Sequence, residues 1–127
     1  MIFLETSFLV GFFLKKDEHH KRALEMMETM KNKEKIISEM VIYETLTVLR
    51  KAKQNNEQVA RAYKSLTKLD VLEDKIYYND SLNYTLHKNS IGFFDNLTYV
   101  VMKNNEIKSI ASFDPDFDIF KDIERIF

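Results

Sequence analysis

The chain has 127 residues, 45% hydrophobic and 31% charged, which suits one domain with its own core. It has no cysteine, which excludes disulfides, thiolate metal sites and a cysteine nucleophile. A net charge of -1 is not the strongly basic balance of a dedicated nucleic-acid binder, so contact with a polyanion would need local basic patches or bridging metal ions. We expect a single cytoplasmic domain over residues 1–127, because the apolar N-terminus lacks signal-peptide features and no uncharged stretch is long enough to cross a bilayer.

The first part of the chain predicts a strand followed by two helices. Residues 2–5 form a short apolar run that is typical of a buried strand. Ser7 is placed to cap a short helix over residues 8–14, and Asp17 to cap a second helix that runs to about Met30. Only two glycines and one proline occur in the whole chain, which favours such helices joined by short connections.

The middle of the chain predicts a strand and two amphipathic helices. Residues 35–38 read as a short strand, and residues 39–53 as a long helix with an apolar stripe. At about 100° per residue, Glu44 lies at the edge of that stripe. Asn55 and Gln58 have the spacing of a capping box, which predicts the start of the next helix.

The last third continues the alternation of helices and strands. Asp80 is expected to cap a helix that reaches His87, and Asp95 lies at the start of another helix. Strands are expected at residues 107–113 and 123–127. This alternation predicts an α/β three-layer sandwich around a mostly parallel sheet.

Four acidic residues lie at the ends of apolar segments. They are Glu5, Glu44, Asp95 and Asp114. In the expected fold Glu5 and Asp114 follow the C-terminal ends of strands, where open α/β sheets bind ligands. Carboxylates that meet there repel one another, so their pKa values rise unless a cation neutralises them. Because hard divalent cations take oxygen ligands, the pattern predicts a metal site, with Asp116 as an outer partner.

Most of these acids also have an ordinary explanation. Asp95 is at a usual N-cap position, Glu44 at a usual site for a surface salt bridge, and Asp114 in a normal turn. Asp118 is expected to be solvated. Glu5 is harder to explain in this way, because a charge that closes a buried strand needs a partner.

Taken in order, these segments resemble the PIN domain, and more narrowly the VapC-type toxin ribonucleases. The resemblance spans the whole chain, and four motifs carry it. They are Ile2-Phe-Leu-Glu-Thr-Ser-Phe-Leu, Ser38-Glu-Met-Val-Ile-Tyr-Glu-Thr-Leu, Phe93-Phe-Asp-Asn-Leu and Ser112-Phe-Asp-Pro-Asp-Phe-Asp. Each motif is weak alone, but four acids in the family's order and context make a fairly specific pattern.

The resemblance implies a metal-dependent endoribonuclease that uses Mg²⁺ or Mn²⁺. It also implies the toxin of a type II toxin–antitoxin pair, usually a homodimer, which a cognate antitoxin inhibits. Glu5 and Asp95 would be the primary ligands, Asp114 a ligand directly or through water, and Glu44 the partner of a metal-bound water or of a second ion. The residues expected to contact the carboxylates or the RNA are Ser7, Ser112 and Lys51, with Thr6, Lys15 and Lys16 as further candidates.

One position departs from the family, which nearly always has Asp where this chain has Glu5. The extra methylene moves the carboxylate by roughly 1 Å, and a displacement of that size costs on the order of a hundredfold in rate. A PIN-like RNA-binding module with little catalysis therefore stays open as an alternative. A signalling domain of the response-regulator kind ranks last. That class requires an early acidic pair and a central phosphoacceptor Asp, whereas this chain has only Glu5 early and no convincing central Asp at a strand end.

Overall fold

The computed structural model describes all 127 residues and has one five-stranded sheet with six α-helices. The strands are β1 (Ile2–Leu4), β2 (Lys35–Ser38), β3 (Asp70–Leu72), β4 (Ser109–Ala111) and β5 (Glu124–Ile126). The helices are α1 (Thr6–Phe13), α2 (His20–Thr29), α3 (Glu39–Lys51), α4 (Asn56–Thr67), α5 (Tyr78–His87) and α6 (Phe93–Asn104). Two short 3₁₀ helices complete the set, η1 (Lys75–Tyr77) and η2 (Pro115–Ile119).

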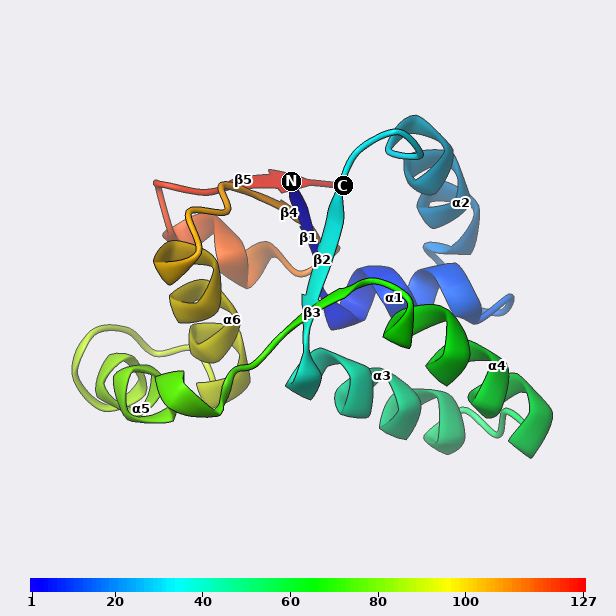
Figure 1. Ribbon diagram of the computed structural model, residues 1–127, viewed down its shortest axis with the longest axis horizontal. Coiled ribbons are helices and arrows are strands. Elements are labelled where there is room, and N and C mark those ends of the chain that lie inside the picture. Colours follow the sequence, from blue (N-terminus) through cyan, green and yellow to red (C-terminus); the bar gives the residue numbers. More distant parts are fainter.

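The sheet has the strand order β3-β2-β1-β4-β5, and every pairing in it is parallel. Helices α1 to α4 lie on one side of the strands, and α5 and α6 lie on the other (Figure 1). The predicted α/β sandwich is therefore confirmed, with a sheet that is wholly parallel. No helix has both the length and the apolar character that crossing a membrane would require.

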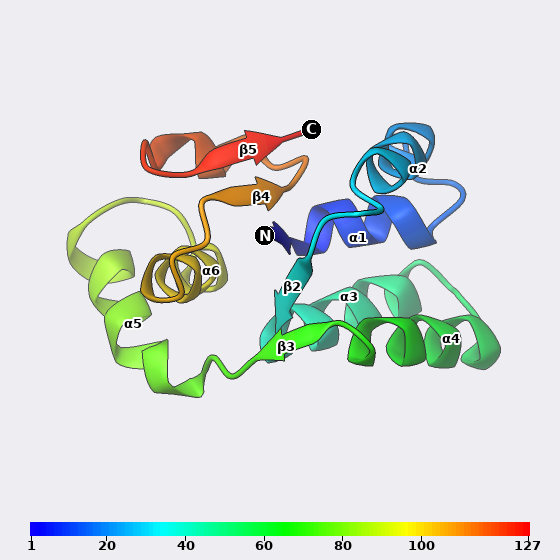
Figure 2. The ribbon, with the colours of Figure 1, turned by 45° about the horizontal axis from the view of Figure 1, so that its top comes forward.

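The order in which successive strands are added to the sheet reverses between β1 and β4. Strands β2 and β3 extend the sheet to one side of β1, and β4 and β5 extend it to the other (Figure 2). Open parallel sheets bind ligands beyond the carboxyl ends of their strands at such a switch point. Glu5 directly follows β1, and Ser112 directly follows β4.

The core explains why these short segments form central strands. All three residues of β1 are buried, as are Ile36 and Ile37 of β2. Strands that helices cover on both faces read as continuous apolar runs, which is the pattern seen here. In η2, Phe117 is 1% exposed and anchors that short segment in the core.

The expected cap of α1 is wrong. The helix begins at Thr6, and Glu5 rather than Ser7 is its N-cap. The Glu5 carboxylate accepts a hydrogen bond of 2.9 Å from the backbone N–H of Ser7. A glutamate is an uncommon cap, so the usual preference for serine pointed to the wrong residue.

Two other caps also differ, and one is confirmed. Asp17 accepts the N–H of His19 and closes a turn, so α2 begins only at His20. Asp80 lies inside the first turn of α5, because η1 leads directly into that helix. The capping box at the start of α4 is confirmed, with both of its reciprocal hydrogen bonds present.

Candidate metal centre

Glu5 directly follows β1, the central strand of the sheet, and is only 7% exposed. Its Oε2 atom accepts hydrogen bonds from the Ser7 N–H at 2.9 Å, from the Ser7 hydroxyl, and from the Ser112 hydroxyl at 2.7 Å. Burial raises the pKa of Glu5 above its ordinary value, although these bonds oppose the rise. Its Oε1 atom accepts no hydrogen bond from the protein, which leaves one oxygen for another partner.

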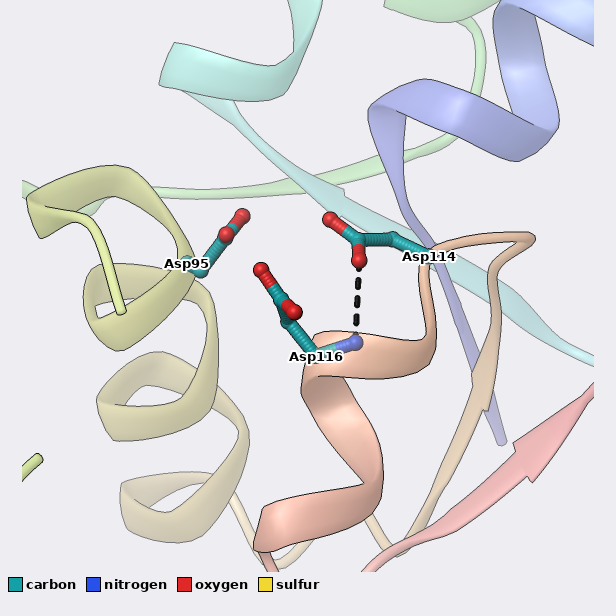
Figure 3. A group of neighbouring side chains, drawn as sticks. All are labelled: Asp95, Asp114 and Asp116. Carbon is teal, nitrogen blue, oxygen red and sulfur yellow. Dashed lines mark hydrogen bonds between the residues drawn. The ribbon is translucent and has the colours of Figure 1, made fainter. Parts of the chain in front are cut away.

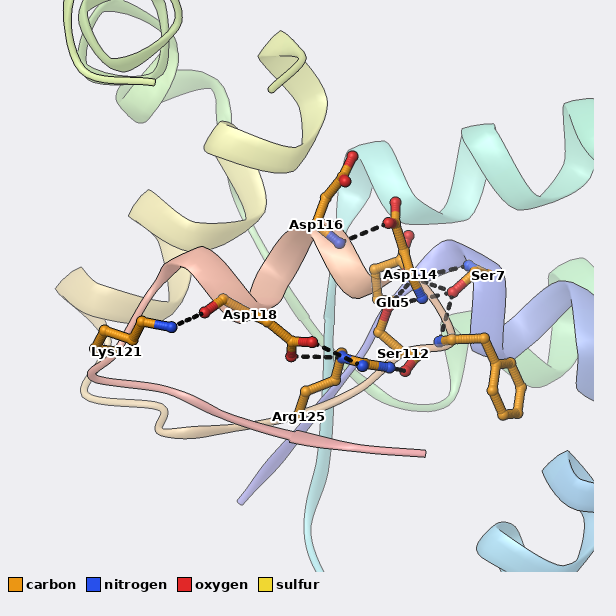
Figure 4. Close-up of polar contacts among 9 residues, drawn as sticks. Glu5, Ser7, Ser112, Asp114, Asp116, Asp118, Lys121 and Arg125 are labelled. Carbon is orange, nitrogen blue, oxygen red and sulfur yellow. Dashed lines mark hydrogen bonds and ion pairs between the residues drawn. The ribbon is translucent and has the colours of Figure 1, made fainter. Parts of the chain in front are cut away.

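The two serine hydroxyls connect the end of β1 to the segment after β4. The Ser7 hydroxyl accepts the N–H of Phe113 at 2.9 Å, and the Ser112 hydroxyl accepts the N–H of Asp114 at 3.0 Å. Both hydroxyls thus hold the Glu5 carboxylate and the neighbouring backbone at once. Figure 4 shows this arrangement.

Three aspartates from two segments come together beside this pair of strands. One carboxylate oxygen each of Asp95, Asp114 and Asp116 lies within 4.8 Å of the others (Figure 3). Asp95 belongs to the first turn of α6. Asp114 caps η2 by accepting the Asp116 N–H at 2.9 Å. Two opposite oxygens around Mg²⁺ would lie about 4.2 Å apart, so the spacing suits one small cation.

The electrostatics of the cluster favour a cation. The pKa of Asp95 is raised to about 7, first by burial and then by neighbouring negative charges. Those charges belong to Glu5, Asp114 and Asp116. A divalent cation would neutralise this crowding, and carboxylate oxygens are the ligands that Mg²⁺ and Mn²⁺ take. The residues present therefore fit such an ion.

Glu44 lies on the same edge, outside the three-aspartate group. It is half-buried on α3, and its Oε1 atom accepts a hydrogen bond of 3.2 Å from the Thr6 hydroxyl. Burial raises its pKa most, and the charges of Asp95 and Asp74 raise it further. Glu44 therefore shares the electrostatic environment of Asp95.

Asp74 is a buried acid for which no pattern in the sequence predicts a role. It follows β3, is 1% exposed, and accepts the N–H of Met40 at 2.8 Å. This bond caps α3, whose own N-cap Ser38 makes no side-chain hydrogen bond. The segment around Asp74 has no clear periodicity, and a cap supplied from 34 residues away leaves no local signal.

The predicted basic contacts lie away from the carboxylates. Lys51 is exposed at the end of α3, about 10 Å along the helix from Glu44. Lys15 and Lys16 line a cavity of about 410 Å³ between α1, α3 and α4. None of these lysines makes an ion pair with the acidic residues.

Comparison of the sequence with protein families identifies the family of this chain. The model of the PIN domain family matches residues 2–123. The chain belongs to the PIN domain family. No curated protein matches its sequence significantly.

Solved structures that are similar in fold to this PIN domain include two from toxin–antitoxin systems. It is similar to VapC20 of Mycobacterium tuberculosis, a sarcin-ricin loop cleaving toxin, with a TM-score of 0.80, 22% identity and 94% of each chain covered. It is also similar to a chain of VapBC2 from Rickettsia felis bound to a promoter DNA fragment. That match has a TM-score of 0.70 and 20% identity, and covers 99% of this chain and 98% of the other. At these identities the likeness is one of fold.

Proposed function

We propose that this PIN domain is a metal-dependent endoribonuclease that hydrolyses RNA phosphodiester bonds with Mg²⁺ or Mn²⁺. The observation that carries the proposal is the group of Asp95, Asp114 and Asp116, which lies beside Glu5 at the switch point of the sheet. PIN family membership supports it independently.

The role that we propose for each side chain follows from its surroundings. The three aspartates would hold the ion together with the Oε1 atom of Glu5, so Asp116 takes a more direct role than its sequence position suggested. Glu44, held by Thr6, would orient a water at the rim of the site. When bound, such an ion activates water, neutralises phosphate charge and stabilises the leaving oxygen.

Substrate binding should depend on the ion. The carboxylate edge repels a polyanion when no cation is bound, so metal and RNA are expected to bind cooperatively. Lys15, Lys16 and Lys51 would contact the RNA backbone farther from the site. Ser7 and Ser112 would act chiefly on Glu5, because their hydroxyls already bind its carboxylate.

We further propose that the protein is the toxin of a type II toxin–antitoxin pair, acts in the cytoplasm and is inhibited by a cognate antitoxin. The fold shared with the two VapC-containing structures supports this role. Expression in a bacterial host should arrest growth, and co-expression of a short neighbouring reading frame should relieve the arrest. Growth that is unaffected while the protein is folded and abundant would contradict the toxin role.

A homodimer is the proposed assembly. Apolar side chains are exposed on η1, α5 and α6, and two of them, Ile76 and Leu86, are 69% and 64% exposed. Leu82 and Phe94 are exposed on the same three elements, which contact one another, and we propose that the four side chains form one surface. Covering it with a second copy would remove apolar area from water. Sedimentation of the parent and of Leu86→Asp tests the assembly, with a dimer expected for the parent and a shift toward monomer for the variant.

The direct test of the enzymatic proposal is cleavage of labelled RNAs with Mn²⁺, with Mg²⁺ and with chelator. Cleavage that requires the metal supports the proposal. The alternative is an RNA-binding module with little catalysis, which the longer Glu5 side chain favours. Tight, metal-dependent RNA binding without cleavage on varied RNAs would select that alternative.

A further inference from the structure

We propose that Arg125, in the last strand, is a positioning residue that holds Asp114 and Asp116 in the geometry required by the cation of the proposed function. The inference rests on that function. In the sequence, Arg125 is close only to Asp114 and Asp116 among the predicted ligands and is far from the others.

The guanidinium of Arg125 joins the two ends of the segment that carries these aspartates. Its Nε and Nη2 atoms donate to the two carboxylate oxygens of Asp118 at 2.8 and 2.9 Å. Its Nη1 atom donates to the backbone carbonyl of Ser112 at 3.2 Å. Figure 4 shows the side chain between these two points. One residue of β5 therefore fixes both the start and the end of residues 112–118.

We call the contacts of Arg125 with Asp118 and with the Ser112 carbonyl the bracket. Through Ser112, the bracket is connected to the carboxylate site. Ser112 also donates its hydroxyl to Glu5 and accepts the N–H of Asp114. A shift of the Ser112 carbonyl would therefore move the hydroxyl that anchors Glu5. Asp118 is solvated as the sequence predicted, with its side chain 55% exposed, and it is also the far end of this bracket.

The contact depends on the shape of arginine. The Arg125 side chain is only 9% exposed, and its guanidinium carbon lies 3.8 Å from the centre of the Phe127 ring. A guanidinium can bind both oxygens of a carboxylate, stack on an aromatic ring and reach a carbonyl at the same time. A lysine ammonium has the same charge without this planar fork, so lysine cannot replace all three contacts.

Charge and geometry act in opposite directions here, which makes the proposal testable. A positive charge close to the aspartates repels a cation, so loss of that charge alone would strengthen metal binding. Loss of the bracket would weaken binding, because the aspartates would no longer be held together. Arg125→Lys keeps the charge and removes the bracket, and it therefore isolates the geometric effect.

The experiment is calorimetric titration of Mn²⁺ into metal-free parent, Arg125→Lys, Asp118→Asn and Arg50→Lys. Arg50 is a matched control, because it is an exposed arginine on α3 that bonds Asn56 away from the site. Arg125→Lys is expected to weaken Mn²⁺ binding by about tenfold or more, as changes around metal ligands commonly do. Asp118→Asn should weaken it less, and Arg50→Lys should not change it. Thermal melts of the same samples ensure that each protein is folded at the titration temperature.

The outcomes separate the two proposals. If the parent binds Mn²⁺ and folded Arg125→Lys binds it within twofold of the parent, the role of Arg125 is overturned while the metal site stands. A lower melting temperature with unchanged affinity has the same meaning, because a merely structural role would not alter binding to the folded protein. If Arg125→Lys does not fold, Asp118→Asn decides, and unchanged affinity in that variant overturns the proposal. A parent that binds no Mn²⁺ overturns both proposals.

Discussion

The Ser112 hydroxyl donates a hydrogen bond of 2.7 Å to the Glu5 carboxylate, across 107 positions of sequence. Both side chains are buried, at the carboxyl ends of the two strands that flank the switch point. The position of Glu5 is therefore set by hydrogen bonds within the protein. Such preorganisation allows a carboxylate one methylene longer than the family norm to occupy a defined place.

Loss of the Ser112 hydroxyl should destabilise the protein. Ser112→Ala leaves the buried Glu5 carboxylate with one donor fewer, and a hydrogen bond to a charged group contributes about 1.5–3 kcal/mol. We expect the free energy of unfolding in chelator to fall by about 1–2 kcal/mol, since Ser7 still binds Glu5. Urea unfolding measures this, with the exposed Ser90→Ala as the control. Equal changes in both variants would contradict the prediction.

Neutralising Asp95 should stabilise the metal-free protein. Asp95→Asn removes one of several mutually repelling charges, so its melting temperature in chelator should rise by about 3–5 °C, or about 1 kcal/mol after allowing for screening at a half-exposed site. Asp80→Asn is the matched control, because Asp80 is exposed at the same third position of helix α5. It should lower the melting temperature slightly or leave it unchanged. A rise in the control that equals the rise in Asp95→Asn would argue against a repulsive cluster.

The stability of the metal-free protein should also depend on pH. The pKa of Asp95 rises from 3.8 to about 7 in the folded state, so the folded protein binds more protons than the unfolded chain between these values. Stability from this group is therefore full below about pH 4 and declines as the pH rises toward 7. Urea unfolding in chelator at about pH 5 and about pH 8 measures the decline. The decline should be smaller in Asp95→Asn, and an identical one would remove Asp95 as its source.

Asp74 should contribute to the stability of α3. Asp74→Ala removes the hydrogen bond to the Met40 N–H and should lower the free energy of unfolding by about 1 kcal/mol, the usual effect of losing a helix cap. Asp74→Asn keeps an acceptor oxygen and should lose less. Urea denaturation of the two variants provides the comparison, and equal losses would mean that the cap is not the reason.

Local patterns in the sequence predicted the order of most elements, whereas the edge strand β3 lies in a stretch to which no element was assigned. Apolar runs and helical spacing depend on residues close together in the chain, which is why β1, α3 and the capping box of α4 were found. Cap positions were less predictable, because several polar residues compete for each one. At α1 the N-cap is Glu5 rather than Ser7, because the Glu5 carboxylate is buried at the junction of strand and helix.

Long-range pairings could not be predicted in the same way. The bond between Arg125 and Asp118 and the cap that Asp74 gives to α3 depend on how the strands are ordered, which local spacing does not encode. Asp116 was expected in an outer role; the turn of η2 brings one of its carboxylate oxygens within 4.8 Å of those of Asp95 and Asp114, and its role there stays a prediction. The prediction that Lys51 contacts RNA stays a prediction.

Single-turnover cleavage of a labelled RNA across a Mn²⁺ titration tests the central claim most directly. The proteins to compare are the parent, Glu5→Asp, Glu5→Gln and Asp95→Asn. Gln keeps an oxygen that can accept the serine hydrogen bonds but removes the charge, so Glu5→Gln and Asp95→Asn should abolish cleavage, with smaller changes in RNA binding. Glu5→Asp restores the family's acid and should cleave as fast as the parent or faster. Parental activity in Glu5→Gln or in Asp95→Asn would contradict the carboxylate metal centre on which the proposed function depends.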